Sequence, residues 1–155
     1  MSALDNVELT LIKDLDDLFR FREWLGRRRP FDAIGFDCET TGFDRYNGKV
    51  RLMQFGDDVA GWAMDRDDWQ GLARWTFANF TGDFIGHNAV FDTTFLQESC
   101  GINVPRGRVH DTMIQSAILE SHMSKALNNQ AGRYVDSAAG GLQAGVKGTN
   151  YSPGT

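Results

Sequence analysis

The chain has 155 residues, of which 41% are hydrophobic and 24% are charged, and its formal net charge is −5. This composition excludes a disordered chain and favours one folded domain with its own core. The negative charge argues against a protein that coats nucleic acid non-specifically, because such coating requires clustered lysines and arginines. It is compatible with an enzyme that holds a strand end through bound cations.

The N-terminal sequence MSALDNVELT lacks the basic-then-apolar order of a secretion signal. No apolar run in the sequence approaches the roughly 20 residues that cross a bilayer. We therefore expect a cytoplasmic protein without a membrane partner. Cys38 and Cys100 form no CxxC pair, so we expect both to be reduced thiols.

In the first half of the chain, apolar or alternating runs predict four strands, at residues 7–12, 33–38, 49–55 and 59–64. Asp14 or Asp16 is expected to cap a helix that ends near residue 28. The pair Asn47-Gly48 favours a hairpin turn before the strand at 49–55.

In the second half, apolar residues at helical spacing predict four helices, at residues 65–79, 90–100, 111–121 and 125–135. Short strands are expected at 84–86 and 109–110. This order of elements predicts an α/β domain with a mixed sheet flanked by helices. We expect the domain to span residues 1–136, followed by a glycine-rich loop or flexible tail at 137–155.

The sequence DCETTG at residues 37–42 follows the apolar strand at 33–38. Because side chains alternate along a strand, Asp37 and Glu39 should point to one face and Cys38 to the other. Two neighbouring carboxylates repel each other, and a hard cation such as Mg²⁺ or Mn²⁺ would relieve that repulsion. We interpret the pair as a candidate metal site at the carboxyl end of a strand.

The sequence GHNAVFD at residues 86–92 leads from a short strand into a helix. If Phe91 and Phe95 pack inward, Asp92 can lean toward the edge of the sheet. His87 is the weakest candidate, because a lone histidine is more often structural than a ligand. Asn88 could equally bind substrate or lock the turn.

The first motif followed by HNxxFD resembles the first two motifs of the DEDD exonuclease superfamily. The continuation His110-Asp111-Thr112-Met113, with an apolar helix after it, is most similar to the 3′→5′ proofreading domain of family A DNA polymerases, which are related to bacterial DNA polymerase I. The resemblance covers roughly residues 7–135. It implies a ribonuclease-H-like fold with a mixed five-stranded sheet.

This resemblance also implies a metal-dependent hydrolase that uses two Mg²⁺ or Mn²⁺ ions per site and acts on the 3′ end of single-stranded DNA. Asp37 would bridge both ions, Glu39 would bind the ion that holds the attacking water, and Asp92 would serve the second ion. A polymerase domain is the partner expected in a full-length chain.

Other matching residues are expected to bind substrate. Thr40 and Thr41 would contact the terminal nucleotide, and Phe43 would form an apolar wedge against the last bases. His87 and Asn88 are further candidates for substrate binding. A core position for Phe43 is equally compatible with the sequence. For Asp111, capping of the helix that follows it is favoured over a role in catalysis.

The third motif of this superfamily, Tyr-x-x-x-Asp or His-x-x-x-Asp, is missing. Gly107 and Gly132 stand four positions before Asp111 and Asp136, and Tyr134 stands only two before Asp136. The simplest interpretation is a fragment, or an early-ending product, of a longer polymerase. We expect impaired nuclease activity for this chain alone, since loss of a metal ligand or an orienting group commonly costs a factor of roughly 10 to 100.

Two other functions remain open from the sequence. The chain could be an RNA 3′-end exonuclease of the same superfamily, because the first two motifs do not reveal whether the 2′-hydroxyl is read. It could also be a non-catalytic remnant that binds nucleic acid or protein, which the missing fourth acid favours and the three retained acids oppose.

Overall fold

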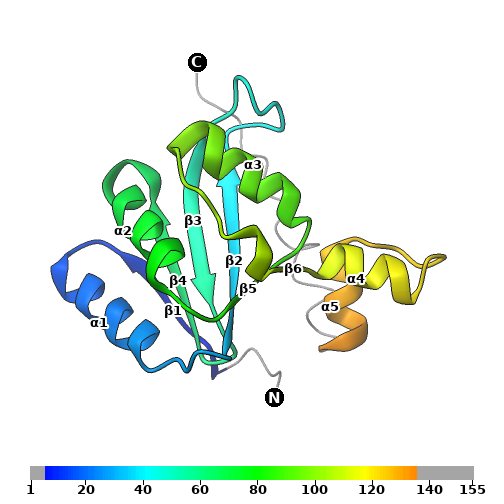
Figure 1. Cartoon of the computed structure of the whole chain (residues 1–155), viewed down its shortest axis with the longest axis horizontal. Helices are drawn as coiled ribbons and strands as arrows, with labels where there is room; N and C mark the ends of the chain where they lie inside the picture. Colours follow the sequence, from blue (N-terminus) through cyan, green and yellow to red (C-terminus); the bar gives the residue numbers. More distant parts are fainter. Residues whose placement is uncertain (1–5, 136–155) are drawn as a thin grey trace. The chain divides into compact units, whose positions relative to one another are not determined.

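The computed structural model describes residues 6–135. The chain divides into two compact units, of which the first is Val7–Thr112 and the second contains residues 113–135 (Figure 1). The predicted glycine-rich segment at 137–155 lies outside the described residues.

The first unit is built on a mixed sheet in the strand order β1-β4-β3-β2-β5-β6. Its strands are β1 (Glu8–Ile12), β2 (Ala33–Thr40), β3 (Val50–Gly56), β4 (Ala60–Asp65), β5 (Asp83–Gly86) and β6 (Val109–Asp111). β3 runs antiparallel to β2 and β4, and the other neighbouring pairs are parallel. The predicted mixed sheet flanked by helices is therefore confirmed. It has six strands rather than five, because β1 extends the sheet by pairing with β4.

The helices of this unit are α1 (Leu15–Gly26), α2 (Arg66–Asn79) and α3 (Ala89–Cys100). The first two begin at acidic caps, and the cap of α1 is one of the two residues that the sequence predicted for it. Asp14 accepts a hydrogen bond from the amide of Asp17 at 3.0 Å, and Asp65 accepts one from the amide of Asp67 at 2.9 Å. Each cap satisfies one of the amide groups that the first turn of a helix leaves without a partner.

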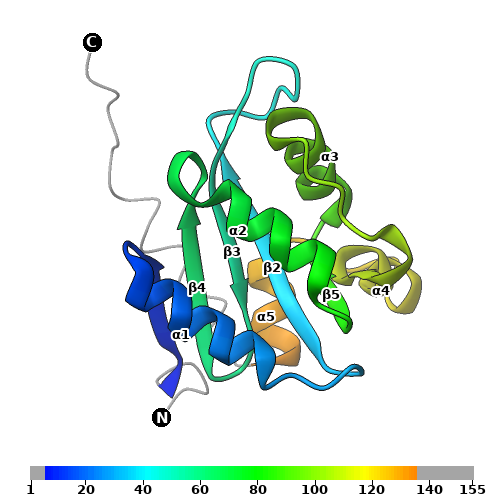
Figure 2. The same ribbon diagram turned by 60° about the vertical axis from the view of Figure 1, so that its left-hand side comes forward.

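An aromatic core joins α1 and α2 to one face of the sheet. Phe21 of α1 lies 5.6 Å from Trp62 of β4, and Phe77 of α2 lies 5.6 Å from Phe36 of β2, between ring centroids. Figures 1 and 2 show both helices along this same face. Full burial of a large apolar side chain stabilises a fold by about 1.5–3 kcal/mol. This packing holds β2 and its neighbours in a rigid platform.

The connection between β2 and β3 differs from the predicted two-residue hairpin turn. A type I′ turn needs positive φ at both central residues, and within residues 6–135 positive φ occurs only at Asn88 and Gly101. The carboxylate of Asp44 instead accepts the amide of Tyr46 at 3.0 Å, and the Asp44 carbonyl accepts the amide of Gly48 at 2.6 Å. These bonds stabilise a longer loop at residues 41–49.

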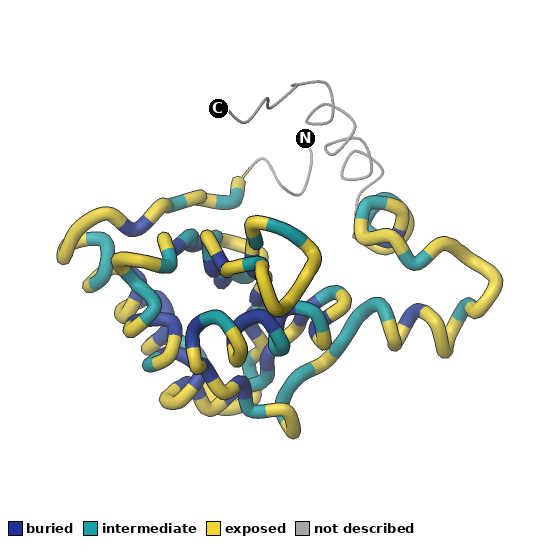
Figure 3. Tube along the Cα trace, turned by 90° about the horizontal axis from the view of Figure 1, so that it is seen from above, coloured by how far each residue is buried: buried dark blue, intermediate teal, exposed yellow. Residues whose placement is uncertain are grey.

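The second unit contains α5 (Leu127–Tyr134) and nearly all of α4 (Thr112–Leu119). The carboxylate of Glu120, after α4, accepts hydrogen bonds from Arg133 at 2.7 Å and from the Tyr134 hydroxyl at 2.6 Å. Figure 3 shows that most positions of these two helices are exposed or partly exposed. None of the helices in residues 6–135 combines the length and the apolar character that crossing a bilayer requires.

Candidate active site

β2 presents Asp37 and Glu39 on the face of the sheet opposite the aromatic core. Along this strand Phe36 and Cys38 are buried at 5% and 6% exposure, while Asp37 and Glu39 are exposed. The alternation expected from the sequence is therefore present. It places the two carboxylates together on the face that does not pack against α1 and α2.

The parallel neighbour of β2 ends early. β5 pairs with β2 only from Ala33 to Gly35, although β2 continues to Thr40. The edge of β2 beyond Gly35 is therefore available to other groups. α3, which follows β5, supplies one such group to this edge.

Asp92 occupies that edge. Its Oδ1 accepts a hydrogen bond from the Cys38 amide at 3.2 Å and another from the Cys38 Sγ at 3.1 Å. Cys38 stands between Asp37 and Glu39, so the structure brings the third predicted acid to the strand that carries the other two. The side chain of Asp92 points into the protein and the residue is only 3% exposed.

Charge and burial act against ionisation of these acids. Burial, then the charges of Asp92 and Glu39, raise the pKa of Asp37 to about 6. Burial also raises the pKa of Asp92, opposed by its hydrogen bonds from Cys38. Burial and the nearby Asp92 raise the pKa of the Cys38 thiol, so Cys38 remains a protonated donor at neutral pH. Asp37 is exposed at the surface, yet the surrounding protein removes part of its hydration, and the remaining solvent screens part of the repulsion on it.

The donor set suits a hard divalent cation in its chemistry. Oxygen ligands and concentrated negative charge are what Mg²⁺ and Mn²⁺ prefer, and a cation here would offset the repulsion between Asp37, Glu39 and Asp92. Within residues 6–135, however, no group of three or more His, Cys, Asp or Glu side chains is already arranged to hold a metal ion. Asp92 is turned toward Cys38, so a cation would have to draw its carboxylate outward or bind through water.

The two threonines after the acids shape the loop that follows. The Thr40 hydroxyl donates to the carbonyl of Gly42 at 2.8 Å, and the Thr41 hydroxyl accepts the amide of Lys49 at 2.9 Å. Phe43 is 93% exposed, with its ring 6.3 Å from that of Phe91, so the alternative of a core position for Phe43 is excluded.

His87 and Asn88 form the turn between β5 and α3. Nδ1 of His87 lies 2.9 Å from the hydroxyl oxygen of Thr112, which in turn donates to the carbonyl of Gly86 at 3.2 Å. Asn88 has φ of 62° and ψ of 42°, in the left-handed region that asparagine tolerates better than most residues. These features support the turn-locking role for Asn88 and a structural role for His87.

Asp111 has a contact that the sequence did not predict. Its carboxylate accepts the amide of Asn88 at 3.1 Å and the amide of Ala89 at 2.8 Å, so it caps the start of α3. No local pattern indicates this contact, because the partners lie 22 and 23 residues away. Cys38 was likewise missed as a contact of Asp92, and only its inward position between two acids could have suggested it.

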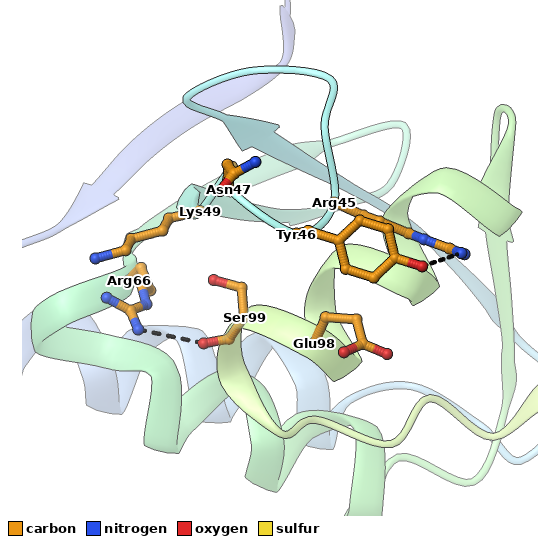
Figure 4. Close-up of a pocket in the computed structure, with 8 residues that line it drawn as sticks. Arg45, Tyr46, Asn47, Lys49, Arg66, Glu98 and Ser99 are labelled. Carbon is orange, nitrogen blue, oxygen red and sulfur yellow. Dashed lines mark hydrogen bonds between the residues drawn. The ribbon is translucent and has the colours of Figure 1, made fainter.

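A small pocket of about 190 Å³ lies beside the 41–49 loop, against the start of α2 and the end of α3 (Figure 4). Three cationic side chains line it: Arg45, Lys49 and Arg66. Arg45 donates to the Tyr46 hydroxyl at 2.7 Å, and Glu98 supplies a carboxylate. The loop that begins next to Glu39 and Thr40 therefore presents positive charge and exposed aromatic rings.

Comparisons with known proteins agree with these features. A family model described as "3′-5′ exonuclease" matches residues 12–143. The chain is 26% identical over 123 residues to the DNA polymerase of Mycobacterium phage D29, covering 75% of this chain and 20% of that polymerase. The chain thus spans about a fifth of this relative.

Solved structures with a similar fold include the catalytic core of RRP6 from Trypanosoma brucei, with 23% identity, a TM-score of 0.66, and coverage of 84% of this chain and 35% of that one. Escherichia coli RNase D is 22% identical with a TM-score of 0.62, and the match covers 83% of this chain and 33% of RNase D. Brucella melitensis NrnC with bound Mg²⁺ is 18% identical with a TM-score of 0.58, and the match covers 83% of this chain and 60% of NrnC. At these identities the likeness concerns the fold.

The family model covers most of the chain, and it includes the strand that carries Asp37 and Glu39 and the helix that carries Asp92. The resemblance inferred from the two sequence motifs is confirmed. Membership of this family implies hydrolysis of nucleic acid from its 3′ end. The chain belongs to the family of 3′-5′ exonuclease domains related to those of family A DNA polymerases.

Proposed function

We propose that this chain is a proofreading exonuclease domain that hydrolyses the terminal phosphodiester of single-stranded DNA with two divalent metal ions. One observation carries the proposal: Oδ1 of Asp92 binds the backbone amide of Cys38 at 3.2 Å, between Asp37 and Glu39. Three acids from two segments, β2 and α3, thereby meet at one edge of β2. Two metal ions bound there would supply an activated water and stabilise the leaving 3′ oxygen.

The chain's own residues would hold and orient the reacting groups. Asp37 and Glu39 supply exposed carboxylate oxygens from a strand whose other face is fixed in the core. Asp92 supplies a third carboxylate whose position is restrained by the amide and the thiol of Cys38. Rigid support of this kind favours catalysis, because small displacements of a metal ligand reduce activity strongly.

The 41–49 loop is suited to hold the strand. Phe43 and Tyr46 are 93% and 77% exposed, and a base of any identity can stack on such rings. Arg45 donates a hydrogen bond to the Tyr46 hydroxyl, and Arg45 and Lys49 line the pocket with Arg66. Cations and aromatic rings together bind single strands with little sequence preference, which a proofreading enzyme needs.

The similarity to a phage DNA polymerase favours a DNA substrate and a polymerase partner. A second candidate substrate is RNA, because the similar fold of RNase D belongs to an exoribonuclease involved in structured RNA processing. Cleavage rates of matched DNA and RNA strands would separate the two. We expect faster cleavage of DNA, and preference for RNA would replace the proofreading role by RNA processing.

The third motif of the superfamily is missing from the sequence, so we propose that cleavage by this chain alone is weak. The direct experiment follows a 5′-labelled single-stranded oligonucleotide during incubation with Mn²⁺. We expect a slow ladder shortened from the 3′ end that disappears in Asp37→Ala and persists in the exposed control Asp58→Ala. Robust cleavage would show that three acids suffice. If there is no cleavage but Mn²⁺ still binds, the chain is a non-catalytic metal-binding remnant.

A further inference from the structure

The start of α3 is capped from a distant strand. Its N-cap residue, Asn88, has left-handed backbone geometry and makes no side-chain capping bond. The carboxylate of Asp111, on β6, takes that place: one oxygen accepts the amide of Asn88 at 3.1 Å and the other accepts the amide of Ala89 at 2.8 Å. Each oxygen of this carboxylate therefore holds one amide at the start of the helix.

This arrangement suits the physics of a helix start. The first amide groups of an α-helix have no partner within the helix, and the positive end of the helix dipole favours a nearby negative charge. The turn has little room to shift, because Ala89 is only 3% exposed and its Cβ would lie 2.9 Å from a Cβ placed on Gly86. The start of α3 is thus fixed in position against β6.

Asp92 stands three residues after Ala89, less than one helical turn along α3. Its Oδ1 must reach both the amide and the thiol of Cys38 on β2, at 3.2 and 3.1 Å. α3 therefore bridges two strands near its start: it is held to β6 through Asp111 and to β2 through Asp92. Any shift of the first turn would move the Asp92 carboxylate along the edge of β2.

We propose that Asp111 is a positioning residue of the exonuclease site: by holding the amides of Asn88 and Ala89, it sets where Asp92 meets the edge of β2. The importance of this role for catalysis rests on the proposed function of Asp92. The restraint of Asp92 by Asp111 is independent of that function, and it can be measured without metal or substrate.

The test measures amide hydrogen exchange by NMR in Asp111→Asn and in a matched control, Asp83→Asn. Asp83 lies on β5, pairs with His110 of β6, and is half exposed. In Asp111→Asn we expect faster exchange at Asn88 and Ala89 and also at the Cys38 amide, which Asp92 protects. In Asp83→Asn we expect these three amides to exchange as in the wild type. Mn²⁺ affinity should fall about tenfold or more in Asp111→Asn only.

Faster exchange confined to Asn88 and Ala89 would mean that Asp111 is only a helix cap, and it would overturn the proposal. Unchanged exchange at all three amides would overturn it as well. If Asp111→Asn does not fold, Asp111→Glu keeps the charge but moves the carboxylate, and it should still accelerate exchange at Cys38. Absence of Mn²⁺ binding by the wild type would reject the proposed function, while the exchange data would still decide whether Asp111 sets the position of Asp92.

Discussion

The carboxylate of Asp92 accepts hydrogen bonds from both the amide and the thiol of Cys38, 54 residues earlier in the chain. These bonds fill the edge of β2 that β5 leaves after Gly35. They satisfy a backbone donor and at the same time bring a third acid to the strand that carries Asp37 and Glu39. The same bonds stabilise the fold and assemble the candidate site.

The Cys38 thiol should contribute measurably to stability through Asp92. Cys38→Ala removes one of two donors from a buried carboxylate, and we expect a loss of about 1–3 kcal/mol in the free energy of unfolding. Cys38→Ser should lose less, because a hydroxyl can still donate. Cys100→Ala is the matched control, since Cys100 is equally buried at 6% and lies at the other end of α3. Urea denaturation would measure these differences, and equal losses for the two alanine variants would contradict the expectation.

Asp37 should destabilise the metal-free protein at neutral pH. Its pKa is raised from 3.8 to about 6 by burial, Asp92 and Glu39. Below the lower value both the folded and unfolded chains carry the proton, so the residue costs nothing. As the pH rises from 3.8 to about 6, Asp37 ionises in the unfolded chain before it ionises in the folded one, so the free energy of unfolding falls. Above about 6 this loss of stability is complete and constant.

Asp37→Asn should therefore be more stable than the wild type at pH 7 to 8, with a difference that shrinks toward pH 4. Thermal unfolding across this range in the presence of a chelator would measure it. The exposed control Asp58→Asn should show no such trend. A stability difference that is independent of pH would show that the raised pKa of Asp37 is wrong. Saturating Mn²⁺ should reverse the order of stability, because only the wild type keeps the full set of acids.

Strand binding should depend on the cations of the 41–49 loop. We expect the double variant Arg45→Ala, Lys49→Ala to bind a single-stranded oligonucleotide more weakly. The slope of log affinity against log salt concentration should also be less steep than in the wild type. We expect a difference of about 0.7 for each phosphate that the variant no longer neutralises. Fluorescence anisotropy at several salt concentrations would measure both. Arg27, directly after α1, is a cation with a 70% exposed side chain, and Arg27→Ala should change neither quantity. A similar loss in this control would attribute the effect to overall charge.

The loop should also require glycine at position 48. A Cβ on Gly48 would approach the carbonyl of Asp44 to 2.7 Å and the ring of Phe95 to 2.9 Å, whereas one on Gly42 would meet nothing within 4 Å. We expect Gly48→Ala to cost about 1–3 kcal/mol of stability and to weaken strand binding, and Gly42→Ala to do neither. Wild-type behaviour of Gly48→Ala would mean that the loop adapts without loss.

The sequence was informative where the physics is local. Alternation along β2 correctly placed Asp37 and Glu39 together, and an acidic cap correctly marked the start of α1. It failed where a contact joins distant segments, as for Asp111 with Ala89, because no local pattern encodes that pairing. The Asn47-Gly48 signal was overridden by the hydrogen bonds of Asp44.

Phe43 shows a third kind of limit. Hydropathy alone could not distinguish a core phenylalanine from an exposed one, and only the position of the loop shows that this ring is 93% exposed. The roles of Thr40 and Thr41 toward a nucleotide likewise remain predictions, since their hydroxyls are observed in bonds within the loop.

Isothermal titration of the chain with Mn²⁺ tests most directly whether acids from separate segments form one cation site. We predict binding in the millimolar range or tighter, weakened about tenfold or more in each of Asp37→Asn, Glu39→Gln and Asp92→Asn and unchanged in Asp58→Asn. A wild-type chain that binds no Mn²⁺, or three variants that bind it as the wild type does, would contradict the existence of this site.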